Sequence, residues 1–418
     1  MEYKKLGDIC DILNGYAFKS DKYVESGIRI IRISNVQKGY IEDKTPAFYP
    51  INTVDIEKYM LSENDLLISL TGNVGRVALL DKKFLPSALN QRVACIRTKT
   101  DIILKEYLFY MMNSDFFENQ CIQSSRGVAQ KNMSTVWLEN YEVPIYPKEV
   151  QLKIVRTLSM LMDIIACYHK QLEKYDELIK ARFVEMFGDP LDKSRIKKKY
   201  IDCVDFNPKK SEIKNLLETM VSFVPMECVG TDGSFSVMRD GKIKEFYKGY
   251  TYFRDGDVLL AKITPCFENG KVAIAEHCTS GIGFGTTEFH VSRPIKGISN
   301  PYWIKYLLKE ENLHNYATIN MSGSAGQKRI QTPFFEKLEV YLPPIELQEQ
   351  FADFVKQIDK SKFVEEKNLI IMCKIKRSLY YDQFWFPKKR KTIWEFCRCC
   401  HICRENFIYR YRCICAEL

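Results

Sequence analysis

The sequence predicts an α+β protein in which a globular module followed by a long helix occurs twice. A heptad pattern runs through residues 148–190, which predicts the first long helix. The residues before this helix resemble those before a second helical segment at 344–386. Short strand patterns within 1–147 and 191–343 then predict the two modules, each compact and built on a strongly twisted sheet.

The first long helix is predicted from apolar residues that recur in alternating steps of four and three. This spacing is the seam of a coiled coil rather than the stripe of an ordinary surface helix. Gly188 and Pro190 end the pattern, since glycine suits the position after a helix and proline cannot continue one. About 40 residues at ~1.5 Å each make a rod on the order of 60 Å long. The helix is therefore either a long core element or a spacer between two modules. The seam residues are Ile154, Leu158, Leu161, Ile165, Tyr168, Leu172, Tyr175 and Ile179.

A gapless alignment indicates the duplication. QKNMSTVWLENYEVPIYPKEVQ, residues 130–151, aligns with QKRIQTPFFEKLEVYLPPIELQ, residues 327–348. Upstream, Asp65-Leu-Leu-Ile parallels Asp257-Val-Leu-Leu. A period of roughly two hundred residues indicates a duplicated domain rather than a solenoid of short repeats.

Composition limits the class of protein. With 418 residues and 46% hydrophobic content, the chain has room for two or three domains with real cores. The polar start and the lack of any long apolar run lead us to expect a soluble, cytosolic protein. An odd total of 15 cysteines without a secretion signal argues for reduced thiols. The net charge of +9 suits a polyanionic partner, although solubility alone would explain it.

The first module should contain several strands and one helix. Residues 3–16 carry apolar side chains on one face and end at Gly15. Residues 29–35 alternate basic and apolar side chains, which predicts a half-buried strand with Arg29 and Asn35 facing outward. The remaining expected elements are a buried strand at 65–70, a hairpin turn at 71–76, strands at 77–80 and 90–96, a helix at 106–121, a polar loop at 124–132 and a closing segment at 136–143.

The second module should follow the same plan. Lys197–Lys199 and Lys209–Lys210 are assigned to a polar linker that leads into it. Strands are expected at 221–226 and 252–260, a hairpin loop at 262–271, a glycine-rich turn into a strand at 281–290, and a polar loop at 321–329. The second long helix, from Glu346 to about Phe384, has a weaker seam, which would gain by packing against the first helix. Its apolar positions Phe351, Val355, Ile358, Leu369, Met372 and Leu379 are interrupted by Lys362, Glu365 and Lys376.

Several stretches resemble the specificity subunit of type I restriction–modification systems. They are LGDICDILNGYAFKS, QLEKYDELIKARFVEMFGDP, KITPCFENGKVAI, GFGTTEFHV and LPPIELQEQFADFV, and the resemblance extends from Met1 to about Phe384. It implies two target-recognition domains that each recognise one half of a split double-stranded DNA sequence. It also implies that the two long helices lie antiparallel as a ruler, seat two modification (methyltransferase) subunits, and are joined by a restriction (translocase–nuclease) subunit.

Base recognition needs Arg, Lys, Asn and Gln on loops that can enter the major groove. Candidates in the first module are Arg29, Asn35, Asn73, Arg76, Asn90, Gln91, Arg92, Gln130 and Lys131. Candidates in the second are Lys262, Thr264, Asn269, Lys271, Thr286, Thr287, Gln327, Lys328 and Arg329. Each could instead be a solvated or turn-capping side chain, and about a third should touch DNA, mostly at phosphate and sugar. The recurring Gln-Lys pairs at 130–131 and 327–328 rank highest, although a shared fold requirement would also explain them. Gly75 and Gly270 should serve the hairpin turns, and Glu288 should contact DNA, cap a loop or position an Arg or Lys.

The motifs of an enzyme are missing from the sequence. There is no phosphate-binding GxxxxGK[ST] loop, and the glycine-rich run at 281–285 lacks the third glycine of a dinucleotide turn. Asn207-Pro208 is followed by two lysines rather than by the Pro-aromatic pair of amino-methyltransferases. His169 lies off the seam and should be a surface residue. We therefore expect a recognition subunit without catalytic residues, cofactor or metal. The alternatives are a stand-alone methyltransferase or nuclease, and a scaffold or RNA-binding protein that uses the coil alone.

The tail, residues 387–418, departs from the family. It is basic and rich in cysteine, and Cys400 and Cys403 with a later CxC could hold zinc. Because the spacing is not that of a standard finger or ribbon, we favour an altered, disordered C-terminus over a metal site. Such a chain would be an inactive or variant copy of a specificity subunit.

Overall fold

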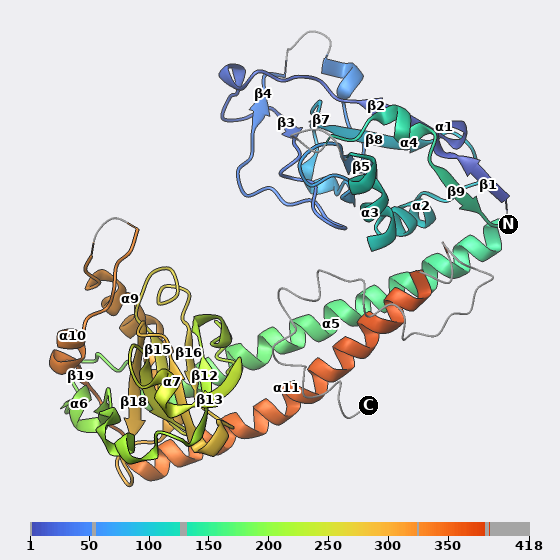
Figure 1. The fold of residues 1–418 in the computed structure, drawn as a ribbon. Helices are drawn as coiled ribbons and strands as arrows, with labels where there is room; N and C mark the ends of the chain where they lie inside the picture. The colour runs from blue at the N-terminus through green and yellow to red at the C-terminus, as the bar shows by residue number, and fades with distance from the viewer. Residues whose placement is uncertain (1, 52–55, 126–131, 324–325, 381–383, 385–418) are drawn as a thin grey trace. The chain divides into compact units, whose positions relative to one another are not determined.

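A computed structural model describes residues 2–51, 56–125, 132–323, 326–380 and 384. The described chain divides into two compact units, 2–167 with 369–380 and 384, and 168–368. The expected α+β architecture with a duplicated module and two long helices is confirmed (Figure 1). The tail at 387–418 lies outside the described residues.

The first unit is built on a four-stranded antiparallel sheet with the order β2-β8-β5-β6. Its strands are β2 (Cys10–Asn14), β8 (Val93–Thr98), β5 (Leu66–Ser69) and β6 (Val77–Leu79). A second sheet holds β4 (Phe48–Tyr49), β3 (Ile28–Ile31) and β7 (Ser87–Leu89), and β1 (Glu2–Lys5) pairs with β9 (Glu142–Ile145). The helices are α1 (Leu6–Ile9), α2 (Lys105–Met112), α3 (Asp115–Ser124) and α4 (Thr135–Glu139).

The second unit repeats this plan. Its antiparallel sheet has the order β11-β18-β15-β16, with β11 (Val204–Phe206), β18 (Phe289–Pro294), β15 (Val258–Ala261) and β16 (Val272–Ile274). A second sheet holds β13 (Arg239–Lys242), β12 (Met220–Val224), β17 (Ile282–Gly285) and β14 (Thr251–Arg254), and β10 (Lys198–Lys199) pairs with β19 (Glu339–Val340). The helices are α6 (Tyr200–Cys203), α7 (Ile243–Phe246), α8 (Pro301–Lys309), α9 (Glu311–Ile319) and α10 (Thr332–Lys337).

An ion pair between a buried aspartate and a partly exposed arginine recurs at the same place in both sheets. Asp65 accepts two hydrogen bonds from Arg97, at 3.0 and 2.6 Å, and Asp257 accepts two from Arg293, both at 2.9 Å. Each aspartate also accepts the backbone N–H of the residue three positions before it, Ser62 or Arg254. Since a buried carboxylate needs such partners, the pair explains why this aspartate recurs before both strands.

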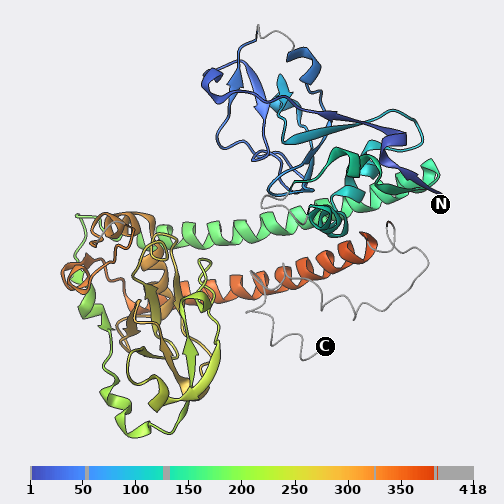
Figure 2. The ribbon, with the colours of Figure 1, turned by 45° about the horizontal axis from the view of Figure 1, so that its top comes forward.

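The long helices α5 (Lys148–Phe187) and α11 (Ile345–Tyr380) begin in one unit and end in the other (Figure 2). The predicted seam of α5 is confirmed: its eight residues are buried or half-buried, whereas His169 is exposed as expected. Gly188 ends the helix with a φ of +67°.

The two helices pack antiparallel within the second unit. Three contacts join the helices: Asp176 with Lys362, Arg182 with Phe354, and Phe187 with Phe351. Residue numbers rise along α5 while those of the α11 partners fall, so the two helices run in opposite directions. In the first unit, Ile154 and Leu158 share a core with Tyr380 and Phe384. The interruption at Lys362 is therefore not a fault in the seam, because its ammonium lies 2.6 Å from the Asp176 carboxylate.

Some expected elements differ from the structure. The segment 106–121 forms two helices, because Ser114 caps α3 by accepting the N–H of Phe117 at 3.2 Å. The segment 252–260 forms two strands, because Gly256 turns the chain with a φ of +88°. Residues 3–16 divide into β1, α1 and β2.

The assignment of Lys197–Lys199 and Lys209–Lys210 to a linker is wrong. Lys198 and Lys199 form β10, which pairs with β19. Lys210 begins the short helix η4 (Lys210–Leu216) and bonds to two backbone carbonyls. These lysines therefore belong to the fold of the second unit.

Candidate nucleic-acid interface

Three loops of the second unit meet at one end of its antiparallel sheet. They are residues 262–264 after β15, 286–288 before β18 and 327–330 before α10, and we call them the second loop cluster. The N–H of Lys262 donates to the Glu288 carbonyl at 2.9 Å, and the N–H of Ile330 donates to the Lys262 carbonyl at 2.9 Å. The backbone thus joins loops that are far apart in the sequence.

The first unit joins its loops by the same bonds. The N–H of Leu70 donates to the Arg92 carbonyl at 3.0 Å, and the N–H of Met133 donates to the Leu70 carbonyl at 2.8 Å. We call residues 70–73, 90–92 and 132–133 the first loop cluster. A β-bridge between Thr71 and Asn132 corresponds to one between Ile263 and Arg329. Arg92 therefore takes the place of Glu288, and Asn132 takes the place of Arg329.

Arg329 and Glu288 form the best-defined side-chain contact of the second loop cluster. The Arg329 Nε lies 3.0 Å from Glu288 Oε2, and Nη2 lies 3.0 Å from Oε1. The hydrogen bonds that Arg329 donates to the Glu288 carboxylate raise the pKa of Arg329. Glu288 thus positions an arginine, which was one of the roles expected for it.

Some of the other candidates of the second unit are hydrogen-bonded within the fold, and others are exposed. Thr264 accepts the N–H of Lys328 at 3.1 Å, and Thr286 accepts the N–H of Glu288 at 3.3 Å, so both hydroxyls fix loops. Lys271 donates to the Met226 carbonyl at 3.1 Å. Lys262 is half-buried, and the exposed candidates are Asn269, Thr287, Gln327 and Lys328.

In the first unit, Asn73, Gln91 and Arg92 of the first loop cluster are exposed. Asn90 is half-buried, and its side chain accepts the N–H of Arg92 at 3.3 Å. Gln130 and Lys131 lie outside the described residues. Only three exposed candidates thus remain among the described loops of this unit.

The expectation that Asn35 faces outward is wrong. Its side chain is 3% exposed, donates to the Glu42 carbonyl and Asp43 carboxylate at 2.9 Å each, and accepts the N–H of Arg32. Arg29 is half-buried and paired with the same Asp43, with its guanidinium 4.9 Å from the centroid of the Phe48 ring. The polar side chains of Arg29, Asn35 and Asp43 therefore stabilise the fold by bonding to one another and to the backbone.

Arg76 is also held by neighbours. Its Nη1 donates to Gln37 at 2.7 Å, and Nε lies 4.0 Å from Glu118. The nearby Gly75 has a φ of +84°, and Gly270 has a φ of +68°. Both glycines thus serve the hairpin turns, as predicted.

A buried histidine, His290, is hydrogen-bonded to the backbone of the second loop cluster. His290 donates from Nε2 to the Ile330 carbonyl at 2.9 Å, while Nδ1 accepts from Asn207 at 3.2 Å. Burial lowers the pKa of His290 to about 4, so the ring is neutral at physiological pH. Its two bonds link the core to the residue next to Arg329.

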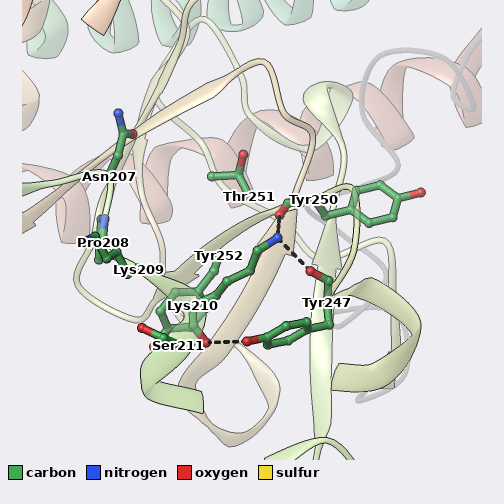
Figure 3. Close-up of a pocket in the computed structure, with 9 residues that line it drawn as sticks. All are labelled: Asn207, Pro208, Lys209, Lys210, Ser211, Tyr247, Tyr250, Thr251 and Tyr252. Atoms are coloured by element: carbon green, nitrogen blue, oxygen red, sulfur yellow. Dashed lines mark hydrogen bonds between the residues drawn. The ribbon is translucent and has the colours of Figure 1, made fainter. Parts of the chain in front are cut away.

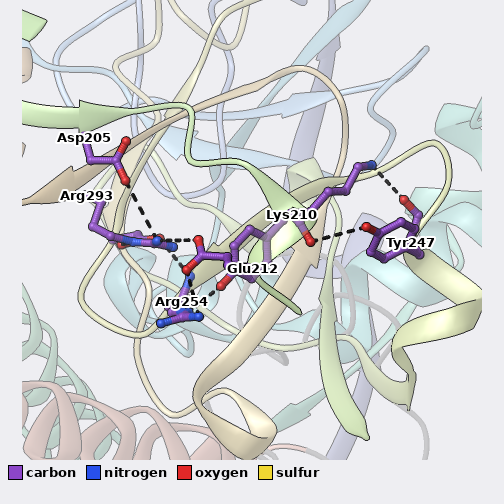
Figure 4. Close-up of polar contacts among 8 residues, drawn as sticks. Asp205, Lys210, Glu212, Tyr247, Arg254 and Arg293 are labelled. Carbon is purple, nitrogen blue, oxygen red and sulfur yellow. Dashed lines mark hydrogen bonds and ion pairs between the residues drawn. The ribbon is translucent and has the colours of Figure 1, made fainter. Parts of the chain in front are cut away.

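An open pocket of about 470 Å³ lies elsewhere on the second unit (Figure 3). Lys210 donates from Nζ to the carbonyls of Tyr247 and Tyr250, at 2.7 and 3.1 Å. The adjoining polar network joins Arg293 to Glu212, and Glu212 to Arg254 (Figure 4). Arg293 also pairs with Asp257. These side chains satisfy one another, so the network supports the sheet and offers no free acid–nucleophile pair.

The described parts of the chain contain no group of three or more His, Cys, Asp or Glu residues suited to a metal ion. In that same portion, the eight cysteines from Cys10 to Cys278 are free thiols. None of the helices among the described residues is long and apolar enough to cross a membrane. The tail cysteines that were weighed as zinc ligands lie outside the described residues.

Sequence reasoning missed two repeated sets of residues. Arg97 and Arg293 clamp the buried aspartates, and Gln151 and Gln348 are fully buried at the starts of α5 and α11. Their recurrence at equivalent positions in the two copies was the available signal. Arg97 and Arg293 lie on β8 and β18, which are neighbours of the strands that the aspartates precede. Sequence spacing alone does not reveal that each arginine pairs with its aspartate.

A sequence model of the type I restriction modification DNA specificity domain matches residues 1–174 and again 208–371. The chain belongs to this family. The type I specificity subunits EcoEI and EcoAI of Escherichia coli are 46% and 44% identical over 130 and 135 residues, 30% and 32% of this chain. Those matches span only 22% and 23% of the two relatives.

A longer match extends over nearly the whole chain. The putative MjaX specificity subunit of Methanocaldococcus jannaschii is 23% identical over 410 residues, which cover 90% of this chain and 91% of the relative. A solved structure concerned with complex assembly and conformational transition of the type I R-M system has a TM-score of 0.55 at 17% identity, covering 91% of this chain and 96% of that one. The S subunit from M. genitalium has a TM-score of 0.52 at 15% identity, with 91% and 94% coverage. The type I specificity fold is thus shared.

Proposed function

We propose that this chain is the DNA-recognition subunit of a type I restriction–modification complex. Each module recognises one half of a split double-stranded target through its loop cluster. The single observation that carries this proposal is the duplicated cluster itself, in which equivalent backbone bonds present different side chains. Two similar scaffolds with different surface residues suit the recognition of two different short sequences.

Within this proposal, a smaller set of residues faces DNA. The exposed candidates are Asn73, Gln91, Arg92, Asn269, Thr287, Gln327 and Lys328, with the half-buried Lys262 and Arg329. Asn35, Arg29, Arg76 and Lys271 are engaged in the fold and are less suited to base contacts. Gln130 and Lys131 remain predictions, as do the boundaries 1–147, 148–190, 191–343, 344–386 and 387–418.

The long helices are proposed to set the spacing between half-sites and to seat two modification subunits, which a restriction subunit then joins. Large apolar side chains stay exposed on both helices. Met160 and Ile164 of α5 are 65% and 42% exposed, and Ile371 and Ile375 of α11 are 49% and 42% exposed. Pairs four residues apart lie on one helix face, which suits a partner with an apolar surface.

Catalysis is assigned to the partners. The modification subunit would supply methyl transfer and the restriction subunit cleavage, so this chain would need no cofactor. Since its substrate is cellular DNA, we place the complex in the cytoplasm. The competing proposal is a stand-alone methyltransferase or nuclease, which would act without partners.

Methylome sequencing tests the proposal. The gene is expressed with its modification subunit in a host that lacks DNA methylation. We expect a split motif of two short half-sites, methylated on both strands. Methylation by the chain alone would support the competing enzyme, whereas co-purification without methylation would identify an inactive copy.

Partner docking has a separate test. Met160→Glu with Ile164→Glu should abolish co-purification with the modification subunit, because charges would replace an apolar contact face. Lys174→Glu changes an exposed residue of the same helix and is the matched control. Equal co-purification of both variants would contradict docking on this face.

A further inference from the structure

The two loop clusters carry different charges at equivalent places. The residue just before strand β8 in the first cluster is Arg92, and the equivalent residue before strand β18 in the second cluster is Glu288. The position bridged to the hairpin is Asn132 in the first and Arg329 in the second. Each cluster therefore presents one guanidinium, but from a different strand of the scaffold.

Glu288 uses only one edge of the Arg329 guanidinium. The carboxylate accepts from Nε and Nη2, while among the described residues Nη1 makes only a long contact of 3.5 Å to the Gln327 carbonyl. An arginine has five N–H donors in a rigid fork. The Nη1 end therefore keeps hydrogens for a second, bidentate partner.

Both members of the pair are held in place by the backbone. Arg329 exchanges two hydrogen bonds with Ser322, at 2.8 and 3.0 Å. Glu288 donates its N–H to the Thr286 hydroxyl, and its carbonyl accepts the N–H of Lys262. With its backbone held in this way and its guanidinium held by the Glu288 carboxylate, Arg329 loses little conformational freedom when it binds.

A simpler explanation is that the pair is an ordinary surface ion pair that stabilises the fold. Such pairs contribute little to stability. The side chains are 33% and 25% exposed, so they border the loop surface rather than the core. The first cluster has the same backbone bonds, but its equivalent described positions hold Arg92 and Asn132 rather than an acid–base pair, so the scaffold does not require one.

We infer that Arg329, aimed by Glu288, is the side chain with which the second module recognises a guanine of its half-site. Arginine binds O6 and N7 of guanine through two parallel hydrogen bonds. Glu288 is a positioning residue in this inference, which rests on the proposed function. Recognition by Arg329 makes the base preference at one position of the second half-site depend on the Glu288–Arg329 pair.

Methylomes of variants in the complex with the modification subunit test this inference. For Arg329→Lys, which keeps the charge but loses the fork, we expect one guanine of the second half to become degenerate while the first half is unchanged. Glu288→Gln should relax the same position. Lys337→Ala removes an exposed cation outside the cluster and should leave both halves intact.

Binding by the purified complex gives a second measurement. Replacing that guanine with 7-deazaguanine should weaken wild-type binding about tenfold or more and leave Arg329→Lys nearly unaffected. A wild-type split motif that Arg329→Lys and Glu288→Gln leave unchanged overturns the inference alone. A wild-type complex that yields no split motif overturns the proposed function, and the inference with it.

Discussion

Replacing Gln348 by alanine should destabilise the second unit strongly. The Gln348 side chain is fully buried at the start of α11. Its oxygen accepts the N–H of Asn300 at 2.9 Å, and its nitrogen donates to the carbonyls of Ile298 and Pro343 at 3.0 and 2.8 Å. Alanine would leave one buried backbone group, the Pro343 carbonyl, and two part-buried ones without this partner.

The expected magnitude follows from those three groups. Each buried polar group left unsatisfied costs about 1–3 kcal/mol. Because water can enter the space and satisfy part of the set, we expect a total loss of ~3–5 kcal/mol in the free energy of unfolding. Gln350→Ala changes an exposed glutamine of the same helix and should alter this free energy by less than about 0.5 kcal/mol.

Hydrogen exchange measured by mass spectrometry is the suitable assay, because it reports opening of each unit separately. Peptides from the second unit should exchange faster in Gln348→Ala. Gln151→Ala should have the mirrored effect on the first unit, since Gln151 makes three equivalent bonds there. Exchange in Gln348→Ala that matches Gln350→Ala would refute the reasoning.

Three further predictions concern the core and the turns. Burial lowers the pKa of His290 to about 4, below the value of about 6.5 for an unfolded histidine, so the unfolded chain binds the proton more readily. Stability should therefore fall by up to about 3 kcal/mol as the pH drops from 6.5 toward 4, and urea unfolding of His290→Gln should lack most of this slope. Gly75→Ala should cost more than Gly270→Ala in thermal unfolding, by at least about 1 kcal/mol. Both glycines have positive φ, but a Cβ at 75 would lie 2.6 Å from Cys121 Cβ, whereas one at 270 meets open space; equal losses would contradict this. Phe351→Ala removes a fully buried ring packed on three aromatic rings and should cost about 3–5 kcal/mol in urea unfolding, whereas a loss below about 1 kcal/mol would show that these contacts are unimportant.

The architecture was predictable because its signals repeat. A heptad seam requires only the spacing of apolar residues, and all eight seam residues of α5 are buried or half-buried. The duplication followed from a gapless alignment, and the matching sheet orders β2-β8-β5-β6 and β11-β18-β15-β16 confirm it. Signals for two missed breaks were also present in the sequence. Ser114 is a favoured helix cap, and Asp255-Gly256 is a favoured turn.

Pairings across long sequence separations were not predictable. Lys362 interrupts a seam when the sequence of α11 is considered alone, but it pairs with Asp176, which lies in the other long helix. Asn35 has the composition of an exposed loop residue, yet its amide is consumed by buried partners. Residue type thus indicated polarity correctly but did not distinguish a binding side chain from a structural one.

The candidate site was predictable at the level of loops. The hairpin loops, the turns before β8 and β18, and the polar loop before α10 were all singled out, and the structure brings the loops of each unit together. The pairing of Arg329 with Glu288 depends on side chains 41 residues apart, so it required coordinates. The contact of these loops with DNA stays a proposal.

Exchanging residues 1–146 for those of a relative with a different DNA target tests the central claim most directly. The hybrid is expressed with its modification subunit in a methylation-free host, and its methylome is compared with that of the original chain. One half of the split motif should change while the other half stays the same. A motif in which both halves change, or in which neither does, would contradict recognition of one half by each module.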